Sequence, residues 1–212
     1  MFVKELWRYP VKSLAGEQIE EARIGLMGIA GDRRIVVCNR GGQVLTSRTH
    51  PRLLGLKAKL DSQGGALVSG HVWDSPQARQ FIQDAAGSDA DLFLHEGVER
   101  FDVLPLLVAT DGAIAHMGYD GRRLRPNIVI GGVKGLEERT WPGRRLRIGD
   151  AVIHVAQLRS RCIMTTYDPD TLKQDLNVLK RIVSELGGRM ALDCSVESEG
   201  VVRMGDPVVL QA

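Results

Sequence analysis

The stretch LRIGDAVIHV (residues 146–155) and its near-repeat VRMGDPVVLQ (residues 202–211) indicate the fold of this chain. In each stretch a Gly-Asp turn is followed by alternating or continuous apolar residues, which is expected where a chain turns at the rim of a β-barrel. Pro207 suits a sheet edge or the first position of the last strand, because proline donates no ladder hydrogen bond. The repeat is too short to indicate a duplicated domain.

Short β-rich runs separated by glycine-containing turns also occupy the amino-terminal region. They lie at 24–26, 34–38 and 44–46, and the segment 53–61 continues the pattern. The turn NRGGQ between the second and third runs is typical of a hairpin. The first ~70 residues are therefore expected to form a small twisted or barrel-like sheet.

Two more β segments follow in the middle of the chain. Residues 104–110 are typical of a buried strand, and Asp111 is placed to cap a short helix through Met117. Pro126 is expected to hold Arg125 in an extended conformation at the start of another strand.

Two longer segments have helical patterns. In WDSPQARQFIQDAAG (residues 73–87), Asp74 or Ser75 can cap a helix, Pro76 can take its first position and Gly87 can end it. This helix is expected to connect two β units, with an apolar face made of Ala78, Phe81, Ile82 and Ala85. The second pattern ends at Gly187-Gly188, and its predicted core stripe consists of Leu176, Leu179, Ile182, Val183 and Leu186.

The composition limits the class of protein. A chain of 212 residues with 43% hydrophobic composition can form one large domain or two small ones that share a core. Its three cysteines, Cys38, Cys162 and Cys194, cannot all pair and form no C-x-x-C motif. They indicate a reducing cytoplasm rather than a disulfide framework or a structural zinc site. Charged residues interrupt the amino-terminal sequence MFVKELWRYPVKSL, so we expect a soluble protein with no signal peptide and no membrane anchor.

The charge pattern argues against several partners. The formal net charge is only +2, although arginines cluster at 122–125 and 144–147; such clusters can bind phosphates but are more often solvated faces. With 5% aromatic residues and no interleaving of arginine with aromatics, nucleic-acid binding is not predicted. The five histidines never fall at metal-ligand spacing, so a histidine-based metal site is not predicted either.

One cysteine lies in an unusual context, LRSRCIMTTYDPDT (residues 158–171). Arg159 and Arg161 flank Cys162, and nearby cations favour the reactive thiolate form. Adjacent residues of a strand point to opposite faces, so Arg161 and Cys162 can share a pocket only if the chain turns near Ser160. From the residues alone, a buried inert cysteine and a functional one are equally good interpretations. Cys38 and Cys194 are expected to be structural.

Six pieces of this sequence form an ordered pattern across nearly the whole chain: LWRYPVKSLAG, GIAGDRRIVVCNRGGQVLTSRTHPRL, RLRPNIVI, W-x4-LRIGD, RSRCIMTTYDPDT and GDPVVL. Together they resemble the MOSC family (the molybdenum cofactor sulfurase C-terminal domain). The resemblance is to the branch with an N-terminal β-barrel subdomain, which includes the mitochondrial amidoxime-reducing components. It is weakest between about residues 61 and 100.

The resemblance implies a mixed α+β, β-dominated fold. Residues 1–92 would form an N-terminal β-barrel-like subdomain with its connector helix, and residues 93–212 a MOSC β-barrel with a few helices. The molybdenum cofactor (Mo-molybdopterin) would lie in a positively charged cleft between them.

The resemblance also implies a set of site residues. Cys162 would ligate molybdenum, since a thiolate suits a soft metal that already has sulfur ligands. Asp102 would lie near the metal and bind water, position substrate or transfer protons. The residues expected to contact the cofactor, including its phosphate, are Lys12, Ser13, Arg33, Arg125, Asn127, Ser160 and Arg161.

Simpler interpretations exist for several of these residues. Lys12 suits a plain surface position, Arg33 follows Asp32 and suits a structural ion pair, and Asn127 suits a cap of its own turn. Two departures from the family pattern affect the pocket. Val103 replaces a hydroxyl residue, which removes one cofactor contact, and Leu172 replaces a glycine in the loop over the pocket.

The resemblance favours a molybdoenzyme that reduces N-hydroxylated compounds such as amidoximes, hydroxylamines and N-hydroxylated bases. With no iron–sulfur domain after residue 212, electrons would come from a separate ferredoxin, flavodoxin or cytochrome b5-like protein. The alternative is a non-redox carrier or sulfur-transfer protein for the cofactor, with Cys162 holding a persulfide. A degenerate member that binds another phosphate-bearing ligand is a third interpretation. The remaining partner is a small-molecule substrate, with no nucleic acid and no membrane.

Overall fold

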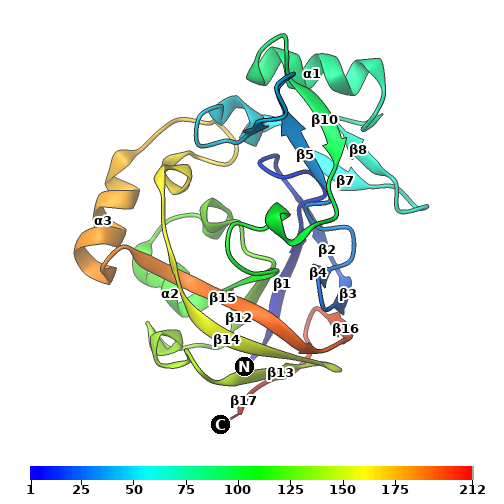
Figure 1. The fold of residues 1–212 in the computed structure, drawn as a ribbon. Coiled ribbons are helices and arrows are strands. Elements are labelled where there is room, and N and C mark those ends of the chain that lie inside the picture. The colour runs from blue at the N-terminus through cyan, green and yellow to red at the C-terminus, as the bar shows by residue number, and fades with distance from the viewer. Residues whose placement is uncertain (212) are drawn as a thin grey trace.

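The structure is a computed structural model that describes residues 1–211. Its largest element is an eight-stranded sheet in the order β17-β13-β14-β15-β11-β12-β1-β2 (Figure 1). Neighbouring strands are antiparallel except β11 and β12, which are parallel. The strands are β1 (Phe2–Arg8), β2 (Glu17–Ile19), β11 (Leu106–Thr110), β12 (Ile128–Gly131), β13 (Arg145–Ile148), β14 (Ala151–Ser160), β15 (Arg189–Ser198) and β17 (Val208–Gln211).

This sheet closes on itself into a barrel. Phe2 pairs with Pro207 in a β-bridge, and Val3 N donates to Asp206 O at 2.9 Å. These bonds bring the two ends of the chain together, as the N and C labels in Figure 1 show. The two Gly-Asp turns have different roles: the turn at 149–150 joins β13 and β14 in a hairpin, whereas the turn at 205–206 separates strands that pair with different partners.

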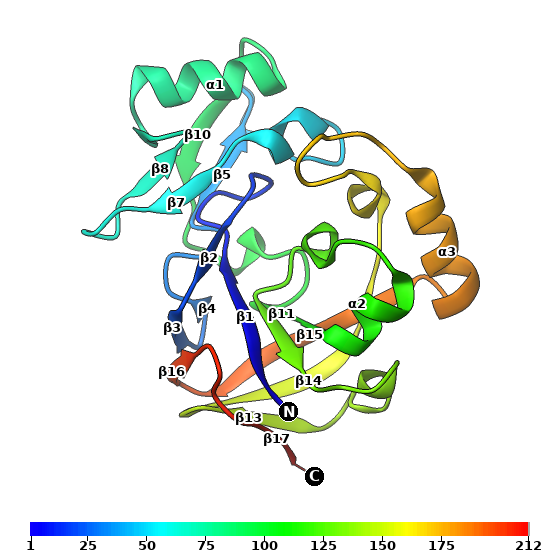
Figure 2. The same ribbon diagram turned by 180° about the vertical axis from the view of Figure 1, so that it is seen from behind.

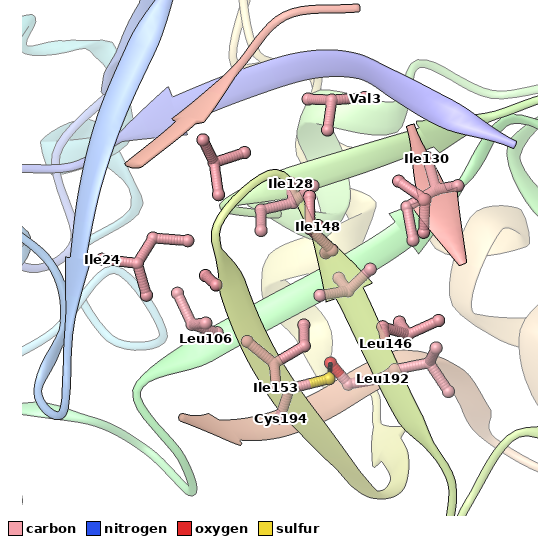
Figure 3. Close-up of a cluster of buried hydrophobic side chains, with 14 of the residues drawn as sticks. Val3, Ile24, Leu106, Ile128, Ile130, Leu146, Ile148, Ile153, Leu192 and Cys194 are labelled. Atoms are coloured by element: carbon pink, nitrogen blue, oxygen red, sulfur yellow. Dashed lines mark hydrogen bonds between the residues drawn. The ribbon is translucent and has the colours of Figure 1, made fainter. Parts of the chain in front are cut away.

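The barrel interior is a hydrophobic core (Figure 3). Because side chains alternate along a strand, Leu146 and Ile148 of β13 and Ile153 of β14 all point inward, and each is fully buried. Complete burial of such a side chain contributes about 1.5–3 kcal/mol. Cys194 is part of this core, as predicted, and its sulfur lies 3.8 Å from Leu192 O. Burial raises the pKa of the Cys194 thiol, so this cysteine is inert.

A second unit lies at the end of the barrel farthest from the termini (Figures 1 and 2). It contains two small sheets, whereas a third small sheet, which takes one strand from the carboxyl-terminal part of the chain, packs its buried side chains into the barrel core instead. The sheets are β10 (Asp91–Leu94) with β5 (Ile35–Cys38) and β6 (Val44–Leu45); β16 (Gly200–Arg203) with β3 (Glu21–Gly25) and β4 (Gly28–Ile29); and β7 (Ala58–Leu60) with β8 (Ala66–Val68) and β9 (His71–Val72).

The expectation of one sheet for the first ~70 residues is therefore wrong, because long-range pairing overrides local order. Strands β1 and β2 belong to the barrel, and β3 pairs with β16. The segment 53–61 begins in a 3₁₀ turn, Pro51–Gly55, and only its end forms β7. The predicted hairpin at NRGGQ is confirmed: it joins β5 to β6, and Asn39 N donates to Gln43 O at 3.0 Å.

The helix α1 (Pro76–Ala86) begins and ends as predicted. Ser75 caps it by accepting a hydrogen bond from Ala78 N at 3.2 Å, and Gly87 follows it. Its predicted apolar face is partly wrong: Phe81 is exposed, and Ala86 is buried against the core of the second unit instead.

Two helices cover the outer face of β11 and β15 (Figure 2). In α2 (Asp111–Met117) the cap is Thr110, not Asp111, because the Thr110 hydroxyl accepts from Ala113 N. In α3 (Leu176–Leu186) the buried stripe is Val178, Ile182 and Leu186. Leu176 and Val183 were predicted to be core but are exposed, since the stripe that meets the barrel is offset by part of a turn. Among the described residues, no helix has the length and apolar character needed to cross a membrane.

Candidate functional site

All nine residues that the sequence predicted for the site line a single pocket between the barrel and the second unit. The chain brings them together from segments that are far apart in sequence. They are Lys12, Ser13, Arg33, Asp102, Arg125, Asn127, Ser160, Arg161 and Cys162.

The pocket wall is strongly basic. Eight cationic side chains line it, whereas the lining contains a single carboxylate, that of Asp102. Five of these cations are paired with carboxylates of the described residues, and the remaining three, Arg100, Arg125 and Arg161, are not, so the wall favours an anionic ligand. The cations are Lys12, Arg33, Arg48, Arg100, Arg123, Arg125, Arg159 and Arg161; of these, Arg48, Arg100, Arg123 and Arg159 were not among the predicted site residues.

Asp102 lies between two cations from the second unit. Lys12 Nζ is 2.9 Å from one carboxylate oxygen and Arg48 NH2 is 2.8 Å from the other. Burial acts to raise the pKa of Asp102, but Lys12 and Arg48 outweigh it and the pKa is lowered. Asp102 in turn raises the pKa of Arg48. The carboxylate is therefore ionised at neutral pH and is an acceptor of hydrogen bonds.

Three predicted cofactor contacts have left-handed backbone conformations. The φ angles are 73° at Ser13, 52° at Arg33 and 57° at Arg125. This corrects the expectation that Pro126 holds Arg125 extended: Arg125 ends a 3₁₀ turn, and its N–H donates to Arg122 O at 3.0 Å. A non-glycine residue in this region costs on the order of 1–3 kcal/mol, and such residues gather at ligand sites. Their concentration in one pocket supports a binding role.

Tyr9 is a site residue that the sequence analysis missed. The guanidinium carbons of Arg125 and Arg33 lie 4.3 and 4.9 Å from the centre of its ring. The Tyr9 hydroxyl donates to Pro126 O at 3.2 Å, and burial raises the Tyr9 pKa to about 12. The ring therefore positions two arginines by cation–π contact. The signal in the sequence that could have identified Tyr9 is its position directly before the P-V-K-S motif.

The simpler interpretation of Arg33 as a member of a structural ion pair also holds, whereas Asn127 does not cap its own turn but bonds to distant segments. Arg33 forms an ion pair with the buried Asp32, whose carboxylate also accepts from Tyr9 N at 2.7 Å. Asn127 Oδ1 accepts from Leu107 N at 3.1 Å and from Arg33 NH1 at 3.2 Å. Both side chains thus fix the pocket wall as well as line it.

Cys162 lies just beyond the end of the long strand β14. The strand stops at Ser160 after an irregularity in its pairing with β15 between Leu158 and Ser160, and a 3₁₀ turn, Ile163–Thr166, begins directly after Cys162. As a result Arg161 and Cys162 line the same pocket. The hydroxyls of Thr165 and Thr166 are buried and donate to the backbone oxygens of residues 162 and 163, so they shape this turn. The thiol of Cys162 is partly exposed, unlike those of Cys38 and Cys194.

Five arginines of the pocket have a buried nitrogen with no hydrogen-bond partner among the described residues: Arg100, Arg123, Arg125, Arg159 and Arg161. In Arg125 this nitrogen is NH2, and in Arg161 it is Nε. Burial lowers the pKa of both side chains to about 10. A buried donor without a partner is costly, and a bound anion would satisfy it. Within residues 1–211 there is no group of three or more His, Cys, Asp or Glu side chains arranged as metal ligands.

Comparison with known proteins agrees with this geometry. Residues 1–98 match the MOSC N-terminal beta barrel domain and residues 110–209 match the MOSC domain. Human mitochondrial amidoxime reducing component 2 is 28% identical, and human component 1 is 26% identical. The alignments cover 97% and 98% of this chain and 82% of each relative. The crystal structure of the YuaD protein from Bacillus subtilis matches with a TM-score of 0.50 at 14% sequence identity. The match covers 100% of this chain and 96% of that chain, and at this identity it supports a similar fold and no more. The two family models leave unmatched only residues 99–109 and the last three, so the chain belongs to the MOSC family, in the branch with the N-terminal β-barrel domain.

Proposed function

We propose that the pocket binds the molybdenum cofactor with Cys162 as a metal ligand, and that the protein reduces N-hydroxylated compounds such as amidoximes and hydroxylamines. The observation that carries this proposal is the pairing of one accessible thiol with eight cations in a single pocket. The relatives' printed names, amidoxime reducing components, support the reaction class. The division into units 1–92 and 93–212 is part of the proposal, with the cofactor bound between them.

The residues present fit this cofactor. Its phosphate needs donors that make charge-assisted hydrogen bonds, and Arg125 and Arg161 have unsatisfied buried nitrogens. Lys12, Ser13 and Ser160 supply further donors on the pocket wall. The cofactor brings its own sulfur ligands, so one thiolate from the protein is a suitable addition.

When bound, the cofactor would supply the two-electron chemistry that removes the oxygen from nitrogen; the protein supplies placement and charge. Asp102 is held between Lys12 and Arg48 and is ionised, so it can accept a hydrogen bond from a substrate N–H group and orient it. This arrangement supports a positioning role for Asp102 more than delivery of a proton. Electrons would come from a separate ferredoxin, flavodoxin or cytochrome b5-like protein.

The second candidate function is a non-redox carrier or sulfur-transfer protein for the same cofactor. The specific observation in its favour is that both oxygens of Asp102 are engaged by cations, which leaves the pocket without a free carboxylate. In this function Cys162 would hold the metal or carry sulfur as a persulfide.

The test is the molybdenum and pterin content of protein made in a host that synthesises the cofactor. We expect near-stoichiometric molybdenum in the wild type and in Cys38→Ala, a matched control outside the pocket, and loss of molybdenum in Cys162→Ala. Loaded protein is then assayed for reduction of benzamidoxime with an artificial electron donor. Turnover supports the reductase, whereas full loading without turnover supports the carrier. Molybdenum retained in Cys162→Ala contradicts the assignment of the ligand.

A further inference from the structure

A second pocket adjoins the first, and most of its lining plays no part in the function proposed above. The two pockets have Arg123, Arg125 and Met164 in common. The second pocket has a volume of about 270 Å³, close to the lower end of the range for small-molecule sites, about 300 Å³. It is formed where the start of the chain meets the Asp-Pro-Asp turn that follows Cys162.

The lining of this second pocket is aromatic. Trp7, Tyr9 and Tyr167 contribute to it, and Leu54, Met164 and Pro169 add apolar surface. Tyr9 is buried, whereas Trp7 and Tyr167 are partly exposed, so two aromatic side chains are open to a ligand. Every planar heteroaromatic ring can stack on such side chains, because stacking needs only a π-face.

The charges of this pocket favour an anion beside the ring. Of its four cations, Arg122 is paired with Asp120 and Asp170, and Arg123 is paired with Asp168. Within residues 1–211, Lys57 and Arg125 form no ion pair with any carboxylate. Arg125 also has the unsatisfied buried nitrogen described above and lines both pockets. A phosphate at the shared wall would meet Arg125, and Lys57 would add a second unpaired cation within the same pocket.

From the aromatic lining, the two free cations and the shared wall, we infer that the second pocket binds a planar aromatic base joined to a phosphate, as in a nucleotide. Two sources have this chemistry. One is the nucleotide half of a molybdenum cofactor extended through its phosphate, which rests on the proposed function. The other is a free nucleotide.

The first experiment measures binding of AMP to cofactor-free protein by calorimetry, with adenosine and ribose 5-phosphate as probes that lack one half of the ligand. We expect AMP to bind and each half to bind at least tenfold more weakly. Lys57→Ala should weaken AMP binding about tenfold, as expected for loss of one charge-assisted contact. Tyr167→Ala should weaken it by about tenfold or more, and Tyr167→Phe should not, because the ring is what stacks.

Lys59→Ala is the matched control, since Lys59 is exposed two residues along the chain and lies outside both pockets. Lys57 is also exposed, so its variant is expected to fold even if Tyr167→Ala does not. AMP binding that is unchanged in Lys57→Ala, or equally weakened in Lys59→Ala, overturns the inference.

The second experiment distinguishes the two sources. Molybdenum-loaded protein is acid-treated, and released nucleotide is measured against molybdenum. A 1:1 ratio identifies the nucleotide half of an extended cofactor, and AMP should then bind only the cofactor-free form. No released nucleotide, together with AMP binding to the loaded form, identifies a free nucleotide. Absence of both released nucleotide and AMP binding overturns the inference. Failure to load molybdenum bears only on the proposed function, since the AMP titration does not need the cofactor.

Discussion

Replacement of Arg125 with glycine should weaken anion binding while changing the free energy of unfolding little. In the folded protein burial lowers the pKa of Arg125 from its ordinary value of 12.5 to about 10. At 1.36 kcal/mol per pKa unit, this corresponds to a cost of about 3 kcal/mol for keeping the charge. Its left-handed backbone adds about 1 kcal/mol, which glycine does not incur.

The losses on replacement are of similar size. The cation–π contact with Tyr9 contributes about 1–2 kcal/mol, the greater freedom of glycine in the unfolded chain costs about 0.5–1 kcal/mol, and the packing of the side-chain stem adds to these losses. The gains of about 4 kcal/mol therefore exceed the quantified losses by about 1–2 kcal/mol, and the lost packing of the stem reduces this difference. We expect the free energy of unfolding to change by less than about 2 kcal/mol, which is a Tm change of less than about 8 °C for a chain of this size.

Anion binding should respond quite differently. Arg125 NH2 is buried without a partner, so a phosphate in the pocket would gain a charge-assisted hydrogen bond of about 1.5–3 kcal/mol. We expect Arg125→Gly to weaken binding of inorganic phosphate to the cofactor-free protein by about 10- to 100-fold in calorimetry. Arg147→Ala, which removes an exposed arginine far along the sheet, is the control for charge. A Tm that falls by more than about 8 °C while phosphate affinity is unchanged would show that Arg125 stabilises the fold and does not bind the anion.

Three further results are expected. Tyr9→Leu should weaken phosphate binding several-fold, because Arg125 and Arg33 lose the ring that positions them, whereas Tyr9→Phe should retain binding; equal affinity in both variants by calorimetry would contradict this role. The ion pairs of Asp102 stabilise the folded protein above the unfolded-state pKa of about 3.9, and this stabilisation is lost as the pH falls through the lowered folded-state pKa. Asp102→Asn should therefore lower the Tm relative to wild type by its full amount at pH 6 and by less in acid. A Tm difference that grows in acid would refute the ion pairs. Ile182→Ala should cost about 2–5 kcal/mol in urea unfolding and Val183→Ala less than about 0.5 kcal/mol, because only the first is buried; equal losses would contradict the placement of α3.

Local chemistry was sufficient to predict several elements of this protein. Ser75, Pro76 and Gly87 define α1 because capping, proline placement and helix termination act within one turn. The hairpin between β5 and β6 is likewise a property of the NRGGQ turn. The ordered motifs led to the family and to nine pocket residues, although their roles as ligands remain predictions.

Other features depend on contacts between distant segments. Leu176 and Val183 have a helical apolar pattern, yet which part of that pattern is buried depends on how α3 meets β11 and β15. Arg125 precedes a proline and was expected to be extended, but the 3₁₀ turn before it and the hydrogen bond of Asn127 N to Leu107 O hold the chain differently. Tertiary packing outweighs such local preferences, which amount to about 1 kcal/mol.

The sequence by itself determined which chemical groups this protein has and the local turns that present them, because caps, turns and motifs act over a few residues. Only the tertiary structure decided that Arg48 lines the same pocket as Cys162, that Tyr9 contacts two of the pocket's arginines, and that the pocket contains eight cations around a single carboxylate. The physical reason is that barrel closure and strand pairing join segments more than a hundred residues apart, and burial among them sets the charge balance.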